Sequence, residues 1–164
     1  MEIEINETNK YNTKDIAKWV RQTLKREMPD FKFSVRIETY TGGSSMTVTM
    51  LRSPVRLLKR LGEIEEQEIL RLMNVRNDTR DEVLGFIKQR LDSDHHDINQ
   101  YYVDEDWSLT EKGKKICSKV LDIANKYNWD NSDAMTDYFD VNYYLDLKLG
   151  DYDRPFIDGS KEVI

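Results

Sequence analysis

A run of potential metal ligands, DSDHHD, occupies residues 92–97. Histidine nitrogens and carboxylate oxygens are common ligands of zinc. Two adjacent histidines on a loop do not easily face one ion, and neither an HExxH motif nor a cysteine pair accompanies His95 and His96. The run therefore favours a solvated polar loop, and we expect no metal and no cofactor.

Two other segments hold residue types that serve nucleophilic catalysis or phosphate binding in other proteins. The single cysteine, Cys117, lies beside Ile116 in an apolar helical stripe, which predicts a buried and inert thiol. The run TGGS at 41–44 is too short for a phosphate-binding loop and lies between two predicted strands, so a hairpin turn explains it. Since 31 Asp and Glu residues place some carboxylates at suggestive spacings by chance, no catalytic constellation is specific. The sequence predicts a protein without enzymatic activity.

Basic side chains gather in two predicted helices, and such side chains commonly contact nucleic-acid phosphates. They are Lys14, Lys18, Arg21, Lys25 and Arg26 in the first helix, and Lys112, Lys114 and Lys115 in the last. The net charge of −6 and the lack of a recognition helix rich in Arg, Asn and Gln speak against nucleic-acid binding. The alternative is that these residues only form the solvent-exposed faces of amphipathic helices.

Acidic side chains gather between Trp129 and Phe156. Four aspartates there, from Asp130 to Asp140, recur at helical spacing and would share one side of a short helix. Carboxylates in a row can imitate the phosphates of a duplex and occupy a basic nucleic-acid channel, and tyrosines can anchor such a contact. The predicted partner-binding residues are Asp130, Asp133, Asp137, Asp140, Tyr144, Asp146, Asp151 and Asp153. The alternative is that these aspartates only cap elements and face water.

Length and composition bound the class of protein. The 164 residues, of which 34% are charged and 38% hydrophobic, predict one globular domain over 1–164. Residues 1–60 carry 12 basic and 7 acidic side chains, whereas 91–164 carry 8 basic and 17 acidic ones. One cysteine excludes an internal disulfide and favours a reducing compartment. No apolar run reaches the roughly 20 residues of a membrane span, so we expect a location in the cytoplasm.

Hydrophobic periodicity predicts the elements that position these side chains. A helix capped by Thr13 ends near Pro29, and two strands meet at a turn in which Gly42 and Gly43 supply positive φ. Further elements are a helical region from Pro54, its continuation after Gly62, a helix capped by Asp78 or Thr79, a short strand at Tyr101–Val103, a helix at 108–128 and a strand at 141–149. The predicted fold class is α+β: a small antiparallel β-sheet, made from the hairpin 33–40/45–51 and the strand 141–149, covered by several α-helices.

Three blocks of sequence resemble a known family: YNTKDIAKWVRQTLKREMPDFKFSVRIETYTGGSSMTV at 11–48, INQYYVDEDWSLTEKGKKI at 98–116 and DNSDAMTDYFDVNYYLDLKLGDYDRPF at 130–156. The first resembles the large-polyvalent-protein-associated domains of phages and conjugative elements, and the others resemble a lineage of that domain from low-GC Gram-positive bacteria. The resemblance implies an α+β fold and a mobile-element origin, and it implies no catalytic residue. Residues 52–97 carry no resemblance and are interpreted as a helical insertion.

The predicted function is therefore that of a non-enzymatic accessory protein of a phage or conjugative element. We expect an anti-defence inhibitor, such as an anti-CRISPR or anti-restriction protein, whose acidic, DNA-mimicking surface binds a host nuclease or nucleoprotein, for example a Cas effector. The alternative is a nucleic-acid-binding module of the same element that uses the basic helix 14–26 and Lys112–Lys115.

Overall fold

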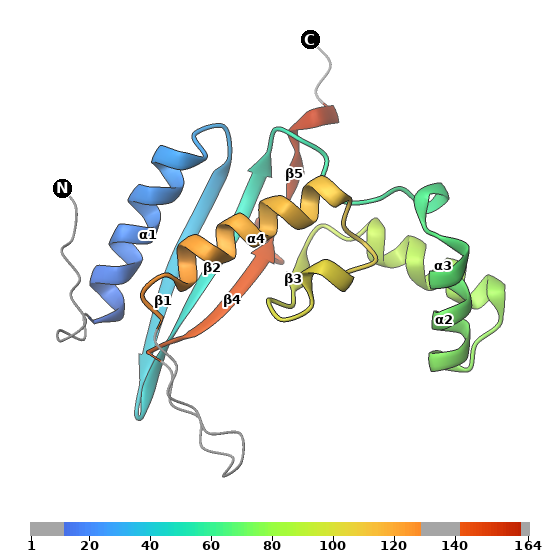
Figure 1. The fold of residues 1–164 in the computed structure, drawn as a ribbon, viewed down its shortest axis with the longest axis horizontal. Helices are drawn as coiled ribbons and strands as arrows, with labels where there is room; N and C mark the ends of the chain where they lie inside the picture. The colour runs from blue at the N-terminus through green and yellow to red at the C-terminus, as the bar shows by residue number, and fades with distance from the viewer. Residues whose placement is uncertain (1–11, 129–141, 162–164) are drawn as a thin grey trace.

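A β-sheet with helices on one of its faces forms the larger part of the protein (Figure 1). The computed structural model describes residues 12–128 and 142–161. In these ranges the elements follow in the order α1 (Thr13–Glu27), β1 (Lys32–Tyr40), β2 (Gly43–Ser53), η1 (Leu61–Glu63), α2 (Glu66–Arg76), α3 (Arg80–Leu91), β3 (His96–Ile98), η2 (Val103–Glu105), α4 (Glu111–Asn125), β4 (Tyr144–Leu149), β5 (Ile157–Asp158) and η3 (Gly159–Lys161). The combination of helices with one sheet confirms the predicted α+β class.

The first helix, α1, is capped by Asn12 and not by Thr13 as predicted. The Asn12 side chain accepts a hydrogen bond from the Asp15 amide at 2.9 Å. The Thr13 hydroxyl is buried and lies 2.5 Å from the hydroxyl of Ser44 at the start of β2. The apolar residues of the helix share one face and contact the sheet: Ile16, Ala17, Val20 and Leu24.

Strands β1 and β2 form the predicted hairpin. Val35 lies opposite Val48 and Ile37 opposite Met46, so the apolar rows of both strands face the helices. Of the two glycines in the turn, only Gly42 has a positive φ, +93°, whereas Gly43 is already the first residue of β2. The tight turn thus needs one glycine and not two.

The predicted strand 141–149 is β4, and residue 141 lies outside the described residues. Its predicted alternation is confirmed, because Leu145 and Leu147 are buried while Tyr144 and Asp146 are exposed. The sheet was predicted to be antiparallel, but β4 runs parallel to β2. Helix α4 explains the difference: it carries the chain back along the sheet before β4 begins (Figure 1), and such a crossover joins parallel strands.

β3 pairs antiparallel with β4 and gives the order β1-β2-β4-β3, while β5 pairs with β2. His96 and Asp97 were predicted to lie at the end of the polar loop 92–97, but they pair with β4 and belong to a strand. His96 and Ile98 turn inward as a result, whereas Asp97 stays exposed. The short strand predicted at Tyr101–Val103 is wrong, because residues 101–105 form a turn and the helix η2.

Residues 54–60 do not form the predicted helix from Pro54. The Lys59 amide donates to the Ser108 carbonyl at 2.8 Å, and the Thr110 amide donates to the Leu57 carbonyl at 2.8 Å. Gly113 in the first turn of α4 permits this contact, since a Cβ atom there would lie 2.4 Å from the Leu57 oxygen. Pairing with the segment before α4 therefore prevails over the local helical pattern.

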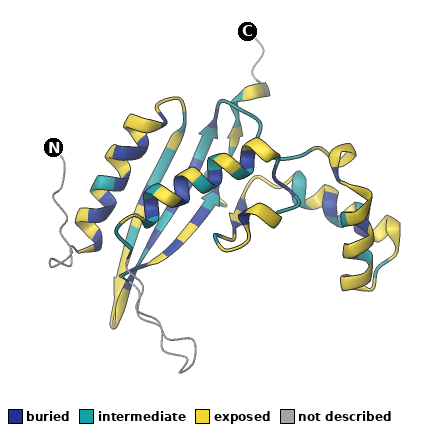
Figure 2. Ribbon diagram, viewed as in Figure 1, coloured by how far each residue is buried: buried dark blue, intermediate teal, exposed yellow. Residues whose placement is uncertain are grey.

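The apolar residues form two separate clusters. The larger lies between the sheet and the helices α1 and α4, which show buried stripes toward the sheet in Figure 2. The smaller joins η1, α2 and α3 and consists of Ile64, Ile69, Leu72, Val83 and Ile87. As predicted, Thr79 caps α3, which lies with α2 to one side of the sheet (Figure 1). The interpretation of 52–97 as an insertion in one domain stays a prediction.

Candidate functional site

The adjacent histidines lie in different surroundings. His95 is exposed, whereas His96 is 1% exposed and its Nε2 lies 3.1 Å from the Ser93 carbonyl oxygen. Burial, with a smaller contribution from Arg90, lowers the pKa of His96, and its Nδ1 has no hydrogen-bond partner within the described residues. Those residues contain no group of three His, Cys, Asp or Glu side chains that could hold a metal ion.

Cys117 is buried in α4, as its position beside Ile116 predicted. Burial raises the pKa of the Cys117 thiol to about 12. At neutral pH the sulfur is therefore protonated, and nucleophilic chemistry requires the thiolate.

The described residues include four of the eight predicted partner-binding residues: Tyr144, Asp146, Asp151 and Asp153. Asp130, Asp133, Asp137 and Asp140 lie outside the described residues. Tyr144 and Asp146 lie on the sheet face opposite the helices, and Asp153 is exposed in the turn after β4.

Asp151 lies in the same turn and forms an ion pair with Arg154 at 2.5 Å. Hydrogen bonds from the Arg154 guanidinium hold the pKa of the Asp151 carboxyl well below its usual range. The Asp151 charge is therefore paired within the chain, and its role in partner binding stays a prediction.

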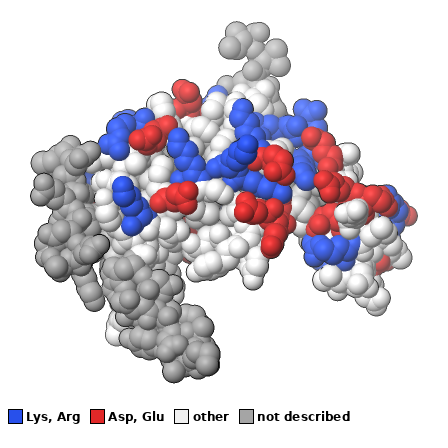
Figure 3. Space-filling model, in the orientation of Figure 1, with Lys and Arg blue, Asp and Glu red and all other residues white. Residues whose placement is uncertain are grey.

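The predicted basic residues all lie on the helices α1 and α4. Helices α1 and α4 lie side by side on the same face of the sheet, although 83 residues separate the end of α1 from the start of α4 (Figure 1). Figure 3 shows blue side chains across this helix layer, with red ones between them. We call the exposed cations of the layer the basic face: Lys14, Lys18, Arg21, Lys25, Arg26, Lys112, Lys115, Lys119 and Lys126.

Aromatic contacts fix the two helices against each other. The rings of Trp19 in α1 and Tyr127 after α4 meet edge to face, with centroids 4.9 Å apart. The Lys126 ammonium lies 5.6 Å from the Trp19 ring centroid and 5.8 Å from that of Tyr127. This contact stabilises the helix pair and holds a cation at the junction.

Hydrogen bonds also tie the end of α4 to the start of β4. The Tyr143 hydroxyl donates to the Ala124 carbonyl, and the Tyr143 amide donates to Asn128 Oδ1 at 3.1 Å. Asn142 Nδ2 donates to the Tyr127 carbonyl at 2.9 Å. The helix α4, which with its C-cap carries four of the nine cations of the basic face, is thus fixed to the sheet at its C-terminal end.

Two members of the basic face, Lys119 and Lys126, were missed by the sequence prediction. The signal was available, because Lys112, Lys115, Lys119 and Lys126 share the outward side of α4 at helical spacing. Lys114, which was predicted to contribute, has a side chain only 17% exposed and pairs with Glu111 at 3.3 Å.

The charge balance of the layer is strongly positive. Each helix, counted from its first residue to its C-cap, holds five Lys or Arg against two Asp or Glu. Within the described part of the chain no ion pair joins Lys18, Lys115 or Lys119 to a carboxylate. Free ammonium groups on a rigid helix are suited to contact phosphates.

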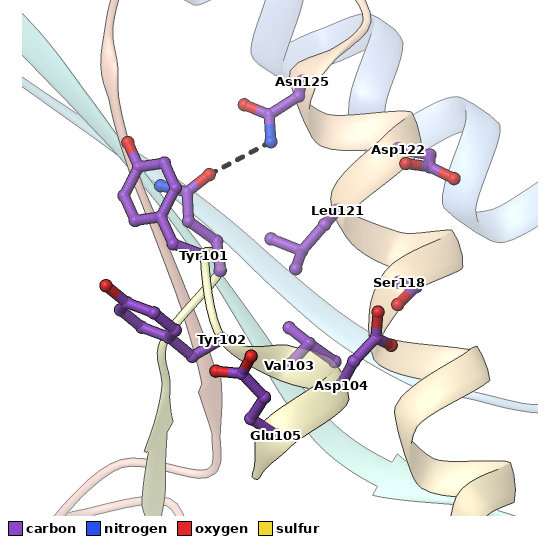
Figure 4. A pocket seen from close by; sticks show the side chains of 10 residues that line it. Tyr101, Tyr102, Val103, Asp104, Glu105, Ser118, Leu121, Asp122 and Asn125 are labelled. Carbon is purple, nitrogen blue, oxygen red and sulfur yellow. Dashed lines mark hydrogen bonds between the residues drawn. The ribbon is translucent and has the colours of Figure 1, made fainter.

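A hollow of about 260 Å³ lies on the other flank of α4, beside η2 (Figure 4). Tyr101, Tyr102, Asp104, Glu105 and Asp122 line it, and no Lys or Arg is among its described lining residues. Two further lining residues are joined by a hydrogen bond, which Asn125 Nδ2 donates to Gln100 Oε1 at 3.1 Å. The acidic lining repels phosphate, so the hollow marks one border of the basic face.

The comparisons with known proteins identify a family. Neither a curated protein nor a solved structure matches the chain. The model of the family described as large polyvalent protein associated domain 29 matches residues 11–110, which include α1 and end just before α4. No helix in the described ranges has the length and apolar character to cross a bilayer. Since the match covers more than half of the sequence, the chain belongs to the large polyvalent protein associated domain 29 family and is a phage- or mobile-element-associated protein.

Proposed function

We propose that this protein is a non-enzymatic nucleic-acid-binding module of a phage or conjugative element, and that it binds through the basic face of α1 and α4. One observation carries the proposal. Two lysine-rich helices that are distant in sequence share one face of the sheet, with ten cations and four carboxylates between them. The chain as a whole has a net charge of −6, so the positive charge of this face contrasts with the negative net charge of the protein.

The contact would be mainly electrostatic. Lys112 and Lys126 are fourteen residues apart, which corresponds to about 21 Å along the helix axis. Along that length a nucleic-acid strand offers several phosphates to the ammonium groups of Lys115 and Lys119. Such contacts carry no base information, so the affinity would be largely independent of sequence.

A binding titration tests the proposal. A fluorescently labelled duplex of about 20 base pairs is titrated with the protein at about 50 mM salt, followed by anisotropy. The wild type should bind, and Lys115→Gln/Lys119→Gln should bind about tenfold more weakly because two phosphate contacts are lost. The matched control is Lys88→Gln/Lys148→Gln, which removes two cations from α3 and from the opposite sheet face and should leave the affinity unchanged. Equal losses in both double variants, or no binding by the wild type, contradict the proposal.

The anti-defence inhibitor remains a separate prediction. It rests on the eight aspartates between Asp130 and Asp158 and on the mobile-element family, which is a setting for inhibitors of host nucleases. Charge reversal at Asp137 and Asp140 would abolish inhibition of such a nuclease and leave the melting temperature nearly unchanged. Inhibition that persists in this variant would contradict the prediction.

A further inference from the structure

A groove of about 700 Å³ lies where α1 ends and β1 begins. Its walls come from three parts of the chain: Arg21 and Lys25 from α1, Lys32 and Phe33 from β1, and Arg154 from the turn after β4. No carboxylate belongs to the described residues that line it. Its volume lies in the range of about 300–1,000 Å³ that is usual for ligand sites. The groove is continuous with the basic face, because Arg21 and Lys25 belong to both.

The four cations of the groove differ in how they are held. Arg21 donates from Nε and Nη2 to the Val35 carbonyl at 3.1 and 2.7 Å, which fixes it along the outer edge of β1. Arg154 is fixed by its ion pair with Asp151. Lys25 and Lys32 are exposed, and neither has a hydrogen bond or ion pair to another described residue. The lysines are therefore available to an anion.

Aromatic rings lie in the same groove. Phe31 and Phe33 are partly buried and stacked, with centroids 6.0 Å apart and an interplanar angle of 15°. A ligand that matches these walls has negative charge beside a planar apolar surface. A nucleotide combines the two, and its base is free to stack on a ring only when it is not inside a paired duplex.

We propose that this groove binds an unpaired nucleotide of a single strand, with its base against Phe31 or Phe33 and its phosphate at Lys25 and Lys32. The inference rests on the proposed nucleic-acid function and adds the kind of strand that is bound. A strand lying on the basic face along α1 enters the groove at Arg21, and its free base is held where α1 ends. The protein therefore prefers single-stranded nucleic acid, or a junction with an unpaired end, to a continuous duplex.

Three probes of equal length separate stacking from charge: a single strand of thymidines, an abasic strand with the same phosphates, and a duplex. Phe33→Leu keeps an apolar side chain but removes the ring. We expect this variant to bind the thymidine strand at least about fivefold more weakly, with unchanged affinity for the abasic strand and the duplex. Lys25→Gln/Lys32→Gln should weaken the binding of both single strands. Thermal unfolding verifies that each variant is folded, and Phe31→Leu replaces Phe33→Leu if the latter does not fold.

The outcomes distinguish this proposal from the one on which it rests. If the wild type binds all three probes equally, or if Phe33→Leu and Phe31→Leu weaken no probe or weaken all of them equally, the groove proposal is wrong and the basic face stands. If the wild type binds none of the probes at low salt, both proposals are wrong. A selective loss for the strand with bases supports the groove as the single-strand site.

Discussion

The two faces of the β-sheet arrange their charges in different ways. On the helix-covered side, the charges of α1 and α4 are mostly positive, although the two helices are distant in the sequence. On the open side, the charges of β1, β4 and β3 alternate in sign: Arg36, Glu38, Asp146, Lys148 and Asp97. Lys148 lies 3.8 Å from Asp97, and Arg36 and Asp146 flank the same residue, Thr47. Both faces contain residues from both ends of the chain, so the tertiary packing decides which charges lie next to one another.

The largest expected difference between the faces concerns neighbouring residues of β4. Leu147 is 2% exposed beneath the helix layer, whereas Asp146 faces water on the open side. Leu147→Ala should lower the free energy of unfolding by about 2–5 kcal/mol, since it leaves a cavity in the core. Asp146→Ala should change it by less than about 0.5 kcal/mol. Urea denaturation measures both, and similar values would contradict this assignment of the two faces.

The contact of α4 with the Leu57 backbone should give the next largest effect on the free energy of unfolding. In Gly113→Ala the new Cβ atom meets the Leu57 backbone, which should lower the free energy of unfolding by about 1–3 kcal/mol. Gly85→Ala is the matched control, because Gly85 lies in α3 with open space around it. There the substitution should stabilise the protein by about 0.5–1 kcal/mol through helix propensity. Stabilisation by Gly113→Ala would show that α4 does not approach residue 57 as described.

His96, the first residue of β3, tests the inward side of the same alternation by pH. The pKa of His96 is lowered in the folded state by burial, so the unfolded chain binds a proton more readily. The stability that neutral His96 contributes is fully present above its unfolded pKa, near 6.5. It is lost as the pH falls toward the folded pKa, and the free energy of unfolding then declines by at most about 1.4 kcal/mol per pH unit. His96→Gln should flatten this decline in the free energy of unfolding. An equally steep decline in this variant would contradict the burial of His96.

The smallest effect concerns the junction between α4 and β4. Tyr143→Phe removes the hydrogen bond to the Ala124 carbonyl and leaves that carbonyl without this donor, which should cost about 1 kcal/mol in the free energy of unfolding. Tyr144→Phe, one residue further on the open face, is the control, because the Tyr144 side chain is 50% exposed and keeps contact with water. Equal melting temperatures for the two variants would show that the junction does not depend on this bond.

The elements with strong local patterns were predictable from sequence. The stripe from Ile16 to Leu24 defined α1, and the alternation from Tyr143 to Leu149 defined β4, because each periodicity reports the face that the element buries. The parallel direction of β4 was not predictable in this way. A strand carries the same alternation in either direction, and the direction follows from the crossover through α4.

Long-range backbone contacts produced the other differences. The helix predicted from Pro54 had a suitable local pattern, but its backbone pairs with residues 108–110. Of the candidate site, the charges of α1 and part of α4 were visible in the sequence, whereas their meeting on one face depends on the tertiary contact of Trp19 with Tyr127. The presence of Arg154 in the same groove as Lys32 could not be predicted from the sequence, because 121 residues separate the two along the chain.

The proposed function requires that the helix layer, and not the open sheet face, contacts phosphates. The most direct test is the salt dependence of oligonucleotide affinity, plotted as the logarithm of the association constant against the logarithm of salt concentration. Replacing Lys14, Lys18, Lys115 and Lys119 by Gln should reduce the magnitude of the slope by about 3, since each lost phosphate contact removes roughly 0.7–0.9. Replacing Arg36 and Lys148 on the open face should leave the slope unchanged. If the slope of the first variant equals that of the wild type, or if the slope of the second variant has a smaller magnitude than that of the wild type, the proposed function is contradicted.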